Sequence, residues 1–446
     1  MSVPMHRNLL KLFCLFAITL LICGPAVTVK TIAQENQQIE YKNTETLFTD
    51  EKIQGILDKI NETLVRSFME YLIFEVGSRY TGSDGCQKAA YYIYNQFKDM
   101  GLQVRYQNWS TRGNKWYSGW FLSQNIEATH QGSDPDCDEV IIFNAHYDTV
   151  EGTVGANDDG SGTVGVLAAA YVLSQYSFKR TMKFVAVSGE EVGLLGSHAY
   201  ATELYNQHTP VLVEFNADMI GKATTAEDGR TIRLSVTEDA GWITDVMKNM
   251  TNKYGLQFNI TAGWSINRDA RRGGSDYFDF IRLGYESVCV WQAGGDQNYH
   301  SPKDDISNVN FSYLVNTTRH IAATMAILAN AEVEVPRVSI VNPRHGKIFY
   351  KDNMSKDTEY NTPIVLDETN IYAEVKQGIY AVDRVEFYYG DKLLFTDTEK
   401  PYEYLLNKRS IGFHMIKVIV YDTKGNSTVD QMKILFLNEN TYKRKK

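Results

Sequence analysis

Acidic and imidazole side chains follow several apolar runs of this sequence, at the points where those runs end. These polar groups are His146 with Asp148, Glu190-Glu191 and Asp218. A fourth group, Asn157-Asp158-Asp159, lies just before the helix predicted to begin at Gly160, and a fifth, Tyr299-His300, follows a further strand and the loop after it. Ligands of an open α/β sheet gather at the edge where its strands end, so residues that follow different strands meet there. A set of His and carboxylate ligands without Cys favours zinc or a related divalent ion. We therefore expect a metal centre at the carboxyl edge of a sheet.

Each of these groups also has an ordinary structural interpretation. A single His after a strand is more often a hydrogen-bonded loop residue, and a Glu-Glu pair at such a place is usually solvated. The segment Asn157–Gly160 fits a turn or a calcium loop, but a calcium loop requires alternating acids and a Glu at its twelfth position, which this segment lacks. The convergence of two His and several carboxylates on one edge, rather than any single residue, indicates the metal centre.

The pattern of residues 51–331 predicts an α/β domain with a mostly parallel, twisted sheet and helices on both faces. Short continuous apolar runs, which indicate buried parallel strands, alternate with helical segments. The predicted strands are Val140–Phe143, Phe184–Val187, Val211–Phe215 and Val288–Trp291. The predicted helices run from Asp50 to about Tyr80, from a cap at Ser83 or Asp84 to Gly101, and over Gly160–Tyr176, Leu194–Tyr205, Asp239–Lys253 and Asn310–Ala331.

Residues 337–438 change character and predict a small all-β domain. The predicted strands are Val338–Val341, Ile371–Val375, Arg384–Tyr389, Lys392–Thr396, Tyr402–Leu406, His414–Tyr421 and Gln431–Leu437. Turns at Gly390-Asp391 and Lys424-Gly425 fit hairpins. This pattern resembles the immunoglobulin-like (Ig-like) sandwiches appended to many exported microbial hydrolases. We expect such a module to serve stability or attachment to a cell surface or another protein. A basic tail, residues 439–446, follows it.

The first 33 residues have the pattern of a signal peptide, and a polar segment, residues 34–50, follows them. Three basic or imidazole side chains precede the apolar run Leu12–Cys23, which is too short to span a bilayer comfortably. Small residues at Thr31 and Ala33 permit cleavage before Gln34. A retained N-terminal membrane anchor is the alternative. The pattern favours a secreted protein or one on the extracellular surface.

Export changes the interpretation of the cysteines. Cleavage leaves Cys86, Cys137 and Cys289, and three thiols permit at most one intramolecular disulfide. Cys289 lies in an apolar run, whereas Cys86 and Cys137 lie in polar contexts, so we predict a disulfide between the latter two. No Cys-x-x-Cys occurs, which excludes a cysteine zinc site. Eight Asn-x-Ser/Thr sequons suit an exported glycoprotein.

The charge balance excludes one class of partner. Lys and Arg number 45 against 54 Asp and Glu, so the formal net charge is −9. No global excess of positive charge points to nucleic acid. Apolar residues make up 43% of the chain, enough to bury a core. The oligomeric state does not follow from the sequence.

Six motifs make a resemblance specific. They are HYDTV at 146–150, GANDDGSG at 155–162, SGEEVGLLGS at 188–197, NADMIG at 216–221, SDYFDF at 275–280 and YHSPKD at 299–304. In this order, and with the twelve-residue step from His146 to Asp158, they resemble the clan MH di-zinc aminopeptidase family. That family includes secreted bacterial leucyl aminopeptidases and glutamate carboxypeptidase II. The resemblance covers the chain from about Asp50 to Ala331.

The resemblance implies two Zn²⁺ ions per chain. Asp158 would bridge both ions, His146 and Asp218 would hold one, and Glu191 and His300 would hold the other. Physical chemistry agrees with this assignment, because two divalent ions about 3.5–4 Å apart need a shared anion to offset their repulsion.

The resemblance also implies catalytic roles. Glu190 would be the general base, and Asp148 would orient the imidazole of His146. Tyr299 matches a tyrosine that steadies the transition-state oxyanion in some relatives. The peptide bond between Asp158 and Asp159 would be cis.

The implied activity is that of a zinc metallo-aminopeptidase, which acts on peptides with a free N-terminus. No additional inserted domain separates the early helices from His146, which favours an aminopeptidase over a carboxypeptidase. A glutaminyl-cyclase-like enzyme, which works with one zinc, is a further alternative. A non-catalytic binding protein, as the transferrin receptor is within this fold, is another. Such relatives have lost metal ligands, whereas this sequence retains all five.

Overall fold

The computed structural model describes residues 49–113, 117–236, 240–256, 258–265, 274–357 and 362–438. The predicted signal peptide, nearly all of the polar segment after it and the basic tail lie outside the described residues. Within the described ranges, no helix is both long enough and apolar enough to cross a membrane.

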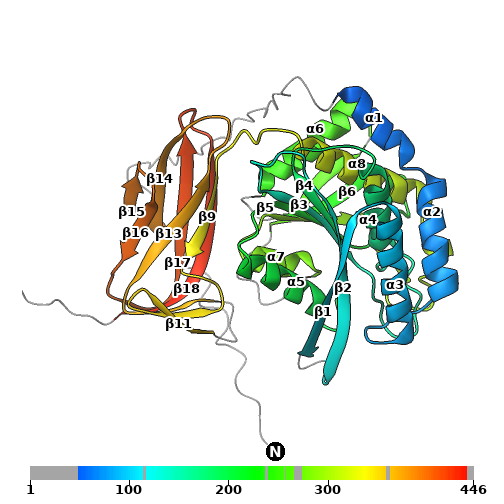
Figure 1. Ribbon diagram of the computed structural model, residues 1–446, viewed down its shortest axis with the longest axis horizontal. Coiled ribbons are helices and arrows are strands. Elements are labelled where there is room, and N and C mark those ends of the chain that lie inside the picture. The colour runs from blue at the N-terminus through cyan, green and yellow to red at the C-terminus, as the bar shows by residue number, and fades with distance from the viewer. Residues whose placement is uncertain are drawn as a thin grey trace, which may run out of the picture. The chain divides into compact units, whose positions relative to one another are not determined.

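An eight-stranded sheet forms the centre of the first part of the chain (Figure 1). Its strand order is β1-β2-β4-β3-β5-β8-β6-β7. The central strands β4, β3, β5 and β8 are parallel to one another, whereas β2 joins β4, and β6 joins β8, in antiparallel pairing. The strands are β1 (Gln103–Arg112), β2 (Trp120–His130), β3 (Val140–His146), β4 (Thr181–Val187), β5 (Val211–Ala217), β6 (Thr231–Val236), β7 (Asn259–Ser265) and β8 (Ser287–Gln292). The predicted fold class is confirmed.

Helices cover both faces of this sheet. The α-helices are α1 (Asp50–Lys59), α2 (Glu62–Glu70), α3 (Asp84–Asp99), α4 (Gly160–Leu173), α5 (Leu195–Asn206), α6 (Gly241–Tyr254), α7 (Tyr277–Arg282) and α8 (Phe311–Leu328). Helix α4 is buried on nearly all sides and packs against β3 on one side and against α2 and α8 on the other. Side chains of α5 and α7 pack on the opposite face, where Tyr200 and Phe280 contact the row that contains Ile142.

The single helix predicted from Asp50 to Tyr80 is wrong. Helix α1 ends at Lys59, and the backbone of the next residue, Ile60, is extended. The side chain of Asn61 then accepts a hydrogen bond from the amide of Leu64 and caps α2. A π-helical turn, η1 (Tyr71–Val76), then continues α2. An Asn that satisfies a free amide at a helix start favours a new helix over continuation of the old one. The predicted cap of α3 is correct, since Ser83 Oγ accepts from the amide of Cys86.

The second part of the chain is all β and forms two sheets. The seven-stranded sheet has the order β11-β10-β12-β18-β17-β14-β15, and the three-stranded sheet has the order β16-β13-β9. The strands are β9 (Arg337–Asn342), β10 (Lys347–Tyr350), β11 (Asn353–Asp357), β12 (Ile364–Leu366), β13 (Thr369–Lys376), β14 (Val382–Tyr389), β15 (Lys392–Asp397), β16 (Tyr402–Leu406), β17 (Ser410–Asp422) and β18 (Ser427–Asn438). All seven predicted strands are present, and both sheets share one apolar core.

The predicted disulfide between Cys86 and Cys137 is wrong, because both thiols are free. Cys86 is buried in the first turn of α3, where its sulfur lies 3.6 Å from the hydroxyl of Ser188, just beyond the carboxyl end of β4. Cys137 precedes β3, at the amino end of the neighbouring parallel strand. Seven residues of strand correspond to about 20 Å, so the two cysteines lie near opposite edges of the sheet.

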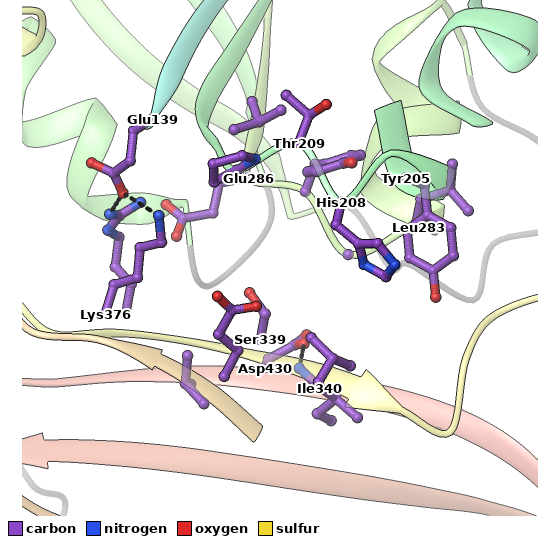
Figure 2. Close-up of a pocket in the computed structure, with 18 of the residues that line it drawn as sticks. Glu139, Tyr205, His208, Thr209, Leu283, Glu286, Ser339, Ile340, Lys376 and Asp430 are labelled. Atoms are coloured by element: carbon purple, nitrogen blue, oxygen red, sulfur yellow. Dashed lines mark hydrogen bonds and ion pairs between the residues drawn. The ribbon is translucent and has the colours of Figure 1, made fainter. Parts of the chain in front are cut away.

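A buried carboxylate, Glu139, joins the two parts of the chain at the amino-terminal edge of the large sheet. It accepts from Arg180 Nε at 3.1 Å and pairs with Arg337, the first residue of β9. A cavity of about 170 Å³ lies beside this group (Figure 2), lined by the segments before β3, β5 and β8 and by β9. Lys376 is also directed toward Glu139 (Figure 2), and its Nζ lies 3.8 Å from Glu139 Oε1. The metal ligands expected at the carboxyl ends of the strands lie at the other edge.

We predict that Glu139→Ala destabilises the protein, because it leaves two buried guanidinium groups without their shared anion. Removal of one partner from a buried ion pair typically costs about 3–5 kcal/mol. Asp138→Ala is the matched control, because the adjacent Asp138 side chain is 75% exposed while that of Glu139 is 9% exposed. An exposed pair contributes roughly 0–1 kcal/mol. Urea denaturation measures both variants, and equal midpoints for the two would contradict the structural role of Glu139.

Candidate metal centre

The predicted ligands lie on strand ends and loops at the carboxyl edge of the parallel strands. His146 is the last residue of β3, Asp218 follows β5, and Glu191 lies in the turn after β4. Asp158 precedes the first residue of α4 by two positions, and the peptide bond that follows it is cis, as predicted. Gly189 allows the turn after β4, since its φ is 85° and an added Cβ would lie 2.8 Å from the ring of Trp109.

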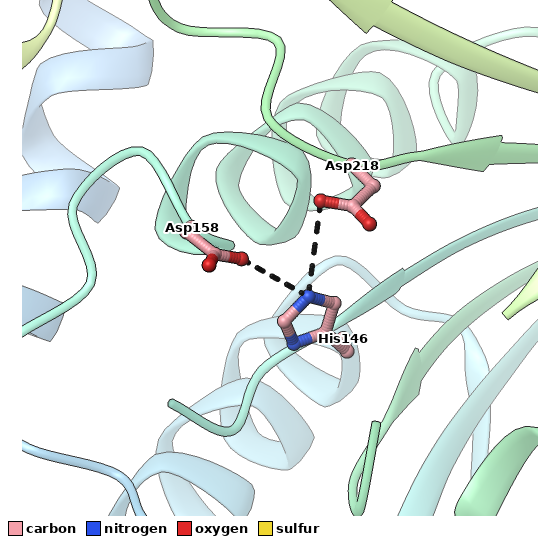
Figure 3. A group of neighbouring side chains, drawn as sticks. All are labelled: His146, Asp158 and Asp218. Atoms are coloured by element: carbon pink, nitrogen blue, oxygen red, sulfur yellow. Dashed lines mark ion pairs between the residues drawn. The ribbon is translucent and has the colours of Figure 1, made fainter. Parts of the chain in front are cut away.

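His146, Asp158 and Asp218 form one buried group (Figure 3). His146 Nε2 lies 3.4 Å from Asp158 Oδ1 and 3.9 Å from Asp218 Oδ1. Two ligand atoms that bind one zinc ion at about 2.0–2.2 Å with tetrahedral angles are separated by roughly 3.3–3.6 Å. The group therefore has the composition and nearly the spacing of a zinc site.

Asp158, Glu191 and His300 form a second group. His300 Nε2 lies 3.1 Å from Asp158 Oδ2 and 3.1 Å from Glu191 Oε2. The two oxygens of Asp158 thus face two different histidines, Oδ1 toward His146 and Oδ2 toward His300. This is the geometry that a carboxylate bridging two metal ions requires.

The charges at this edge favour bound cations. Burial raises the pKa of Asp218 to about 7, because an isolated carboxylate is poorly solvated there. Burial lowers the pKa of His300, but its hydrogen bonds to Asp158 and Glu191 outweigh burial and raise that pKa to about 10. Within the described residues, Glu191 Oε1 is buried without a hydrogen-bond partner. Divalent ions would stabilise the ionised carboxylates and use this free oxygen.

Glu190 lies beside the two groups but belongs to neither. Burial raises its pKa well above the ordinary value for a glutamate, although the neighbouring His146 opposes this shift. A raised pKa suits a group that takes up and releases a proton.

Asp148 connects His146 to the Glu190–Glu191 turn. Its carboxylate accepts from the backbone amides of Glu190 and Glu191, both at 3.3 Å, and from Thr81 Oγ1 at 2.7 Å. His146 Nδ1 lies 3.6 Å from this carboxylate and 3.1 Å from the backbone carbonyl of Asp148. Asp148 therefore positions the imidazole and the Glu-Glu turn together. Such outer contacts orient metal ligands.

Tyr299 lies at the edge of the site. Its ring stacks on the imidazole of His300, with centroids 3.7 Å apart, and its side chain is half-exposed. The stacking restricts the orientation of His300 and leaves one face of the tyrosine accessible from solvent.

Asp304 is a positioning residue that sequence reasoning missed. Its Oδ1 accepts from the amide of Asn157 and its Oδ2 from the amide of Asp158, both at 2.9 Å. Its backbone carbonyl accepts from the amide of Ala156 at 3.0 Å. Asp304 follows His300 by four residues, so it joins the loop of one histidine to the loop of the bridging carboxylate. The sequence did offer one indication of this role, because Asp304 ends the motif YHSPKD that contains His300.

Arg79 was also missed. Its guanidinium is fully buried and donates to the carbonyls of Tyr147, Val154 and Gly155 at 2.6–2.9 Å. Burial lowers its pKa to about 10. These bonds hold together the long loop between His146 and Asp158. An arginine that precedes the loop by some seventy residues leaves no local pattern in the sequence.

Residues 125–325 match the family model described as Peptidase family M28. The matched region contains the strands and loops that bear all five predicted ligands. This match covers less than half of the chain, and over that region it agrees with the predicted resemblance to a zinc-peptidase family.

Known proteins with related sequences and folds agree with this match. The chain is 29% identical over 246 residues to a probable leucine aminopeptidase 2 of Aspergillus oryzae, and the match covers 50% of this chain and 48% of that protein. This chain thus spans about half the length of that relative. An aminopeptidase from Aneurinibacillus sp. strain AM-1 has the same fold, with a TM-score of 0.53, 17% identity, and coverage of 63% of this chain and 96% of its own. A zinc aminopeptidase from Bacillus subtilis gives a TM-score of 0.53 at 18% identity, with coverage of 61% and 96%.

We predict that Asp304→Asn weakens zinc binding. An asparagine has one acceptor oxygen and places an NH₂ group against one of the two amides, so the loop of Asp158 loses a contact. Loss of an outer partner typically costs about 10–100-fold in metal affinity. Asp305→Asn is the matched control, because the carboxylate of Asp305 accepts only from Ser307, within its own turn, among the bonds described. Dialysis against zinc buffers with elemental analysis measures both affinities. Unchanged affinity in Asp304→Asn would contradict the positioning role.

Proposed function

We propose that this chain is an exported di-zinc exopeptidase, most simply an aminopeptidase that removes N-terminal residues from peptides. The observation that carries the proposal is the placement of Asp158, with one oxygen toward His146 and the other toward His300. Asp218 completes the first group and Glu191 the second. Export is supported by the pattern of the first 33 residues.

The residues of the chain would divide the work of hydrolysis. Bound zinc ions supply a polarised water and stabilise negative charge on the scissile carbonyl. Glu190, which is in neither ligand group, accepts the proton of the attacking water and passes it to the leaving amine. Asp148 keeps the Glu190–Glu191 turn beside His146, because its carboxylate accepts hydrogen bonds from the backbone amides of both glutamates. Tyr299, stacked on His300 and open to solvent, is placed to donate to the developing oxyanion.

A free α-amine suits the charge of this site. Besides the ligands, the carboxylates of Glu190 and the fully buried Asp276 contribute negative charge near the centre. Burial raises the pKa of both groups, and the charge of Asp276 raises the pKa of Glu190 further. An ammonium group entering the site would offset this negative charge, whereas the carboxylate terminus of a carboxypeptidase substrate would add to it. The names of the related proteins support the same choice.

The alternatives predict different metal content or products. A glutaminyl-cyclase-like enzyme would use one zinc, and a non-catalytic binding protein would lack ligands. The pairing of two complete groups around one shared carboxylate favours a two-metal peptidase over both. Digestion of a peptide library with mass spectrometry of the products would separate loss of N-terminal residues from loss of C-terminal residues.

We predict that Glu190→Gln and Glu191→Gln fail in different ways. Glu190→Gln keeps the shape but removes the base, so zinc content and fold should be retained while the rate falls by about 10²–10⁴. Glu191→Gln removes a ligand, so one zinc ion should bind more weakly. Zinc analysis and peptide turnover of both variants check this. Metal loss in Glu190→Gln with two retained ions in Glu191→Gln would exchange the two roles.

We predict that acetylation of a substrate's N-terminus abolishes its cleavage. Acetylation removes the positive charge that the carboxylates of the site would bind. The comparison uses one peptide in free and acetylated forms, with turnover followed by mass spectrometry. Equal rates would indicate an endopeptidase or a carboxypeptidase instead.

A further inference from the structure

Two rows of apolar side chains cross the seven-stranded sheet of the second part of the chain. The register places β10, β12, β18 and β17 side by side. The first row is Tyr350, Leu366, Leu437 and Ile411, and the second row is Ile348, Ile364, Leu435 and Phe413. We call these eight residues the apolar band.

The band faces away from the core. The residues that alternate with it, Phe349, Val365 and Phe436, are at most 1% exposed and belong to the core shared by the two sheets. Within the band, Tyr350, Ile411 and Phe413 are 54%, 61% and 62% exposed. The solvated face of such a sheet normally carries polar side chains. A contiguous exposed apolar surface marks a binding site for a protein or a membrane.

Two lysines lie beside aromatic rings of the band, Lys351 directly after β10 and Lys433 on β18. Lys351 Nζ lies 5.5 Å from the ring centroid of Tyr350 on β10, and Lys433 Nζ lies 5.4 Å from that of Phe413 on β17. Arg409 is exposed in the turn that leads into β17, whereas the neighbouring Lys408 lies over the ring of Tyr389, a residue of the core-facing side. Two acids near the same end are engaged within the fold, since Asp352 accepts from the amide of Asn370 and Glu368 from Asn407.

The sequence that follows β18 is also basic. Residues 443–446 are Lys-Arg-Lys-Lys, and they follow the last residue of β18, Asn438, within eight positions. This concentration of basic residues occurs in a chain whose net charge is −9.

We propose that the apolar band binds the surface of an anionic lipid membrane. Such a surface offers both features that the band would complement, an acyl boundary for the apolar rows and negative headgroups for the lysines. A second copy of the chain fits less well, because a two-fold contact through the band would place the same basic rims opposite each other. Lys351 and Lys433 can keep their ammonium groups at the headgroups while their stems lie along the rings. The inference is independent of the zinc chemistry.

Sedimentation with lipid vesicles tests this proposal. The chain beginning at Gln34, which keeps every described residue, is mixed with vesicles of phosphatidylcholine alone or of phosphatidylcholine with phosphatidylglycerol. We expect binding to the anionic vesicles, a marked decrease in high salt, and weak binding to the neutral vesicles. Ile411→Ser with Phe413→Ser should reduce binding roughly tenfold or more, since two apolar side chains lose their burial. Lys433→Glu should reduce binding to the anionic vesicles.

The matched control carries Tyr372→Ser with Leu405→Ser, which removes exposed apolar side chains from the three-stranded sheet. This control should bind like the unmodified chain. Equal binding by control and band variants, or no binding to anionic vesicles, would overturn the proposal. Light scattering that shows a dimer disrupted by the band variants would instead identify a second copy as the occupant. Peptide turnover should be equal in all these variants, so failure here is separable from failure of the proposed function.

Discussion

The metal centre depends on a single buried carboxylate whose two oxygens face two different histidines. Asp158 lies between His146 and His300, and each pair of atoms is within 3.4 Å. A carboxylate in this position belongs to both ligand groups, so a shift of its side chain would weaken the binding of both ions. Much of the surrounding structure can be understood as the means by which this one side chain is held.

Three side chains far apart in the sequence hold the loops around it. Arg79 donates to carbonyls of the loop that leads from His146 toward Asp158, and Asp304 accepts the amide of Asp158 itself. Asp148 binds the turn that carries Glu190 and Glu191. All three are buried, so their hydrogen bonds have little competition from water. The parallel strands bring these loops to one edge, and the hydrogen bonds then set the distances among the ligands.

Much of this arrangement could be predicted from the sequence. The central strands were predictable because parallel strands covered on both faces are continuous apolar runs. His146, Glu191 and Asp218 were predictable because they lie at or just after the ends of those runs, whereas Asp158 and His300 lie in longer loops and were assigned from the family resemblance. The two outer strands on each side of the sheet, β1 with β2 and β6 with β7, were not predicted because partial exposure gives them mixed composition; β1, for example, contains only two buried residues. Arg79 and Asp304 escaped because their bonds join residues more than sixty positions apart. The predicted Cys86–Cys137 disulfide was wrong because the polarity of the neighbouring residues does not show at which edge of the sheet a cysteine lies. The apolar band depends on cross-strand register, which strand prediction alone does not supply.

Anomalous scattering at the zinc edge, from crystals of the protein grown with zinc, tests the central claim most directly. The account predicts two peaks about 3.5–4 Å apart, one beside His146 and Asp218 and one beside Glu191 and His300, with Asp158 between them. A single peak, or two peaks that do not share Asp158, would contradict it.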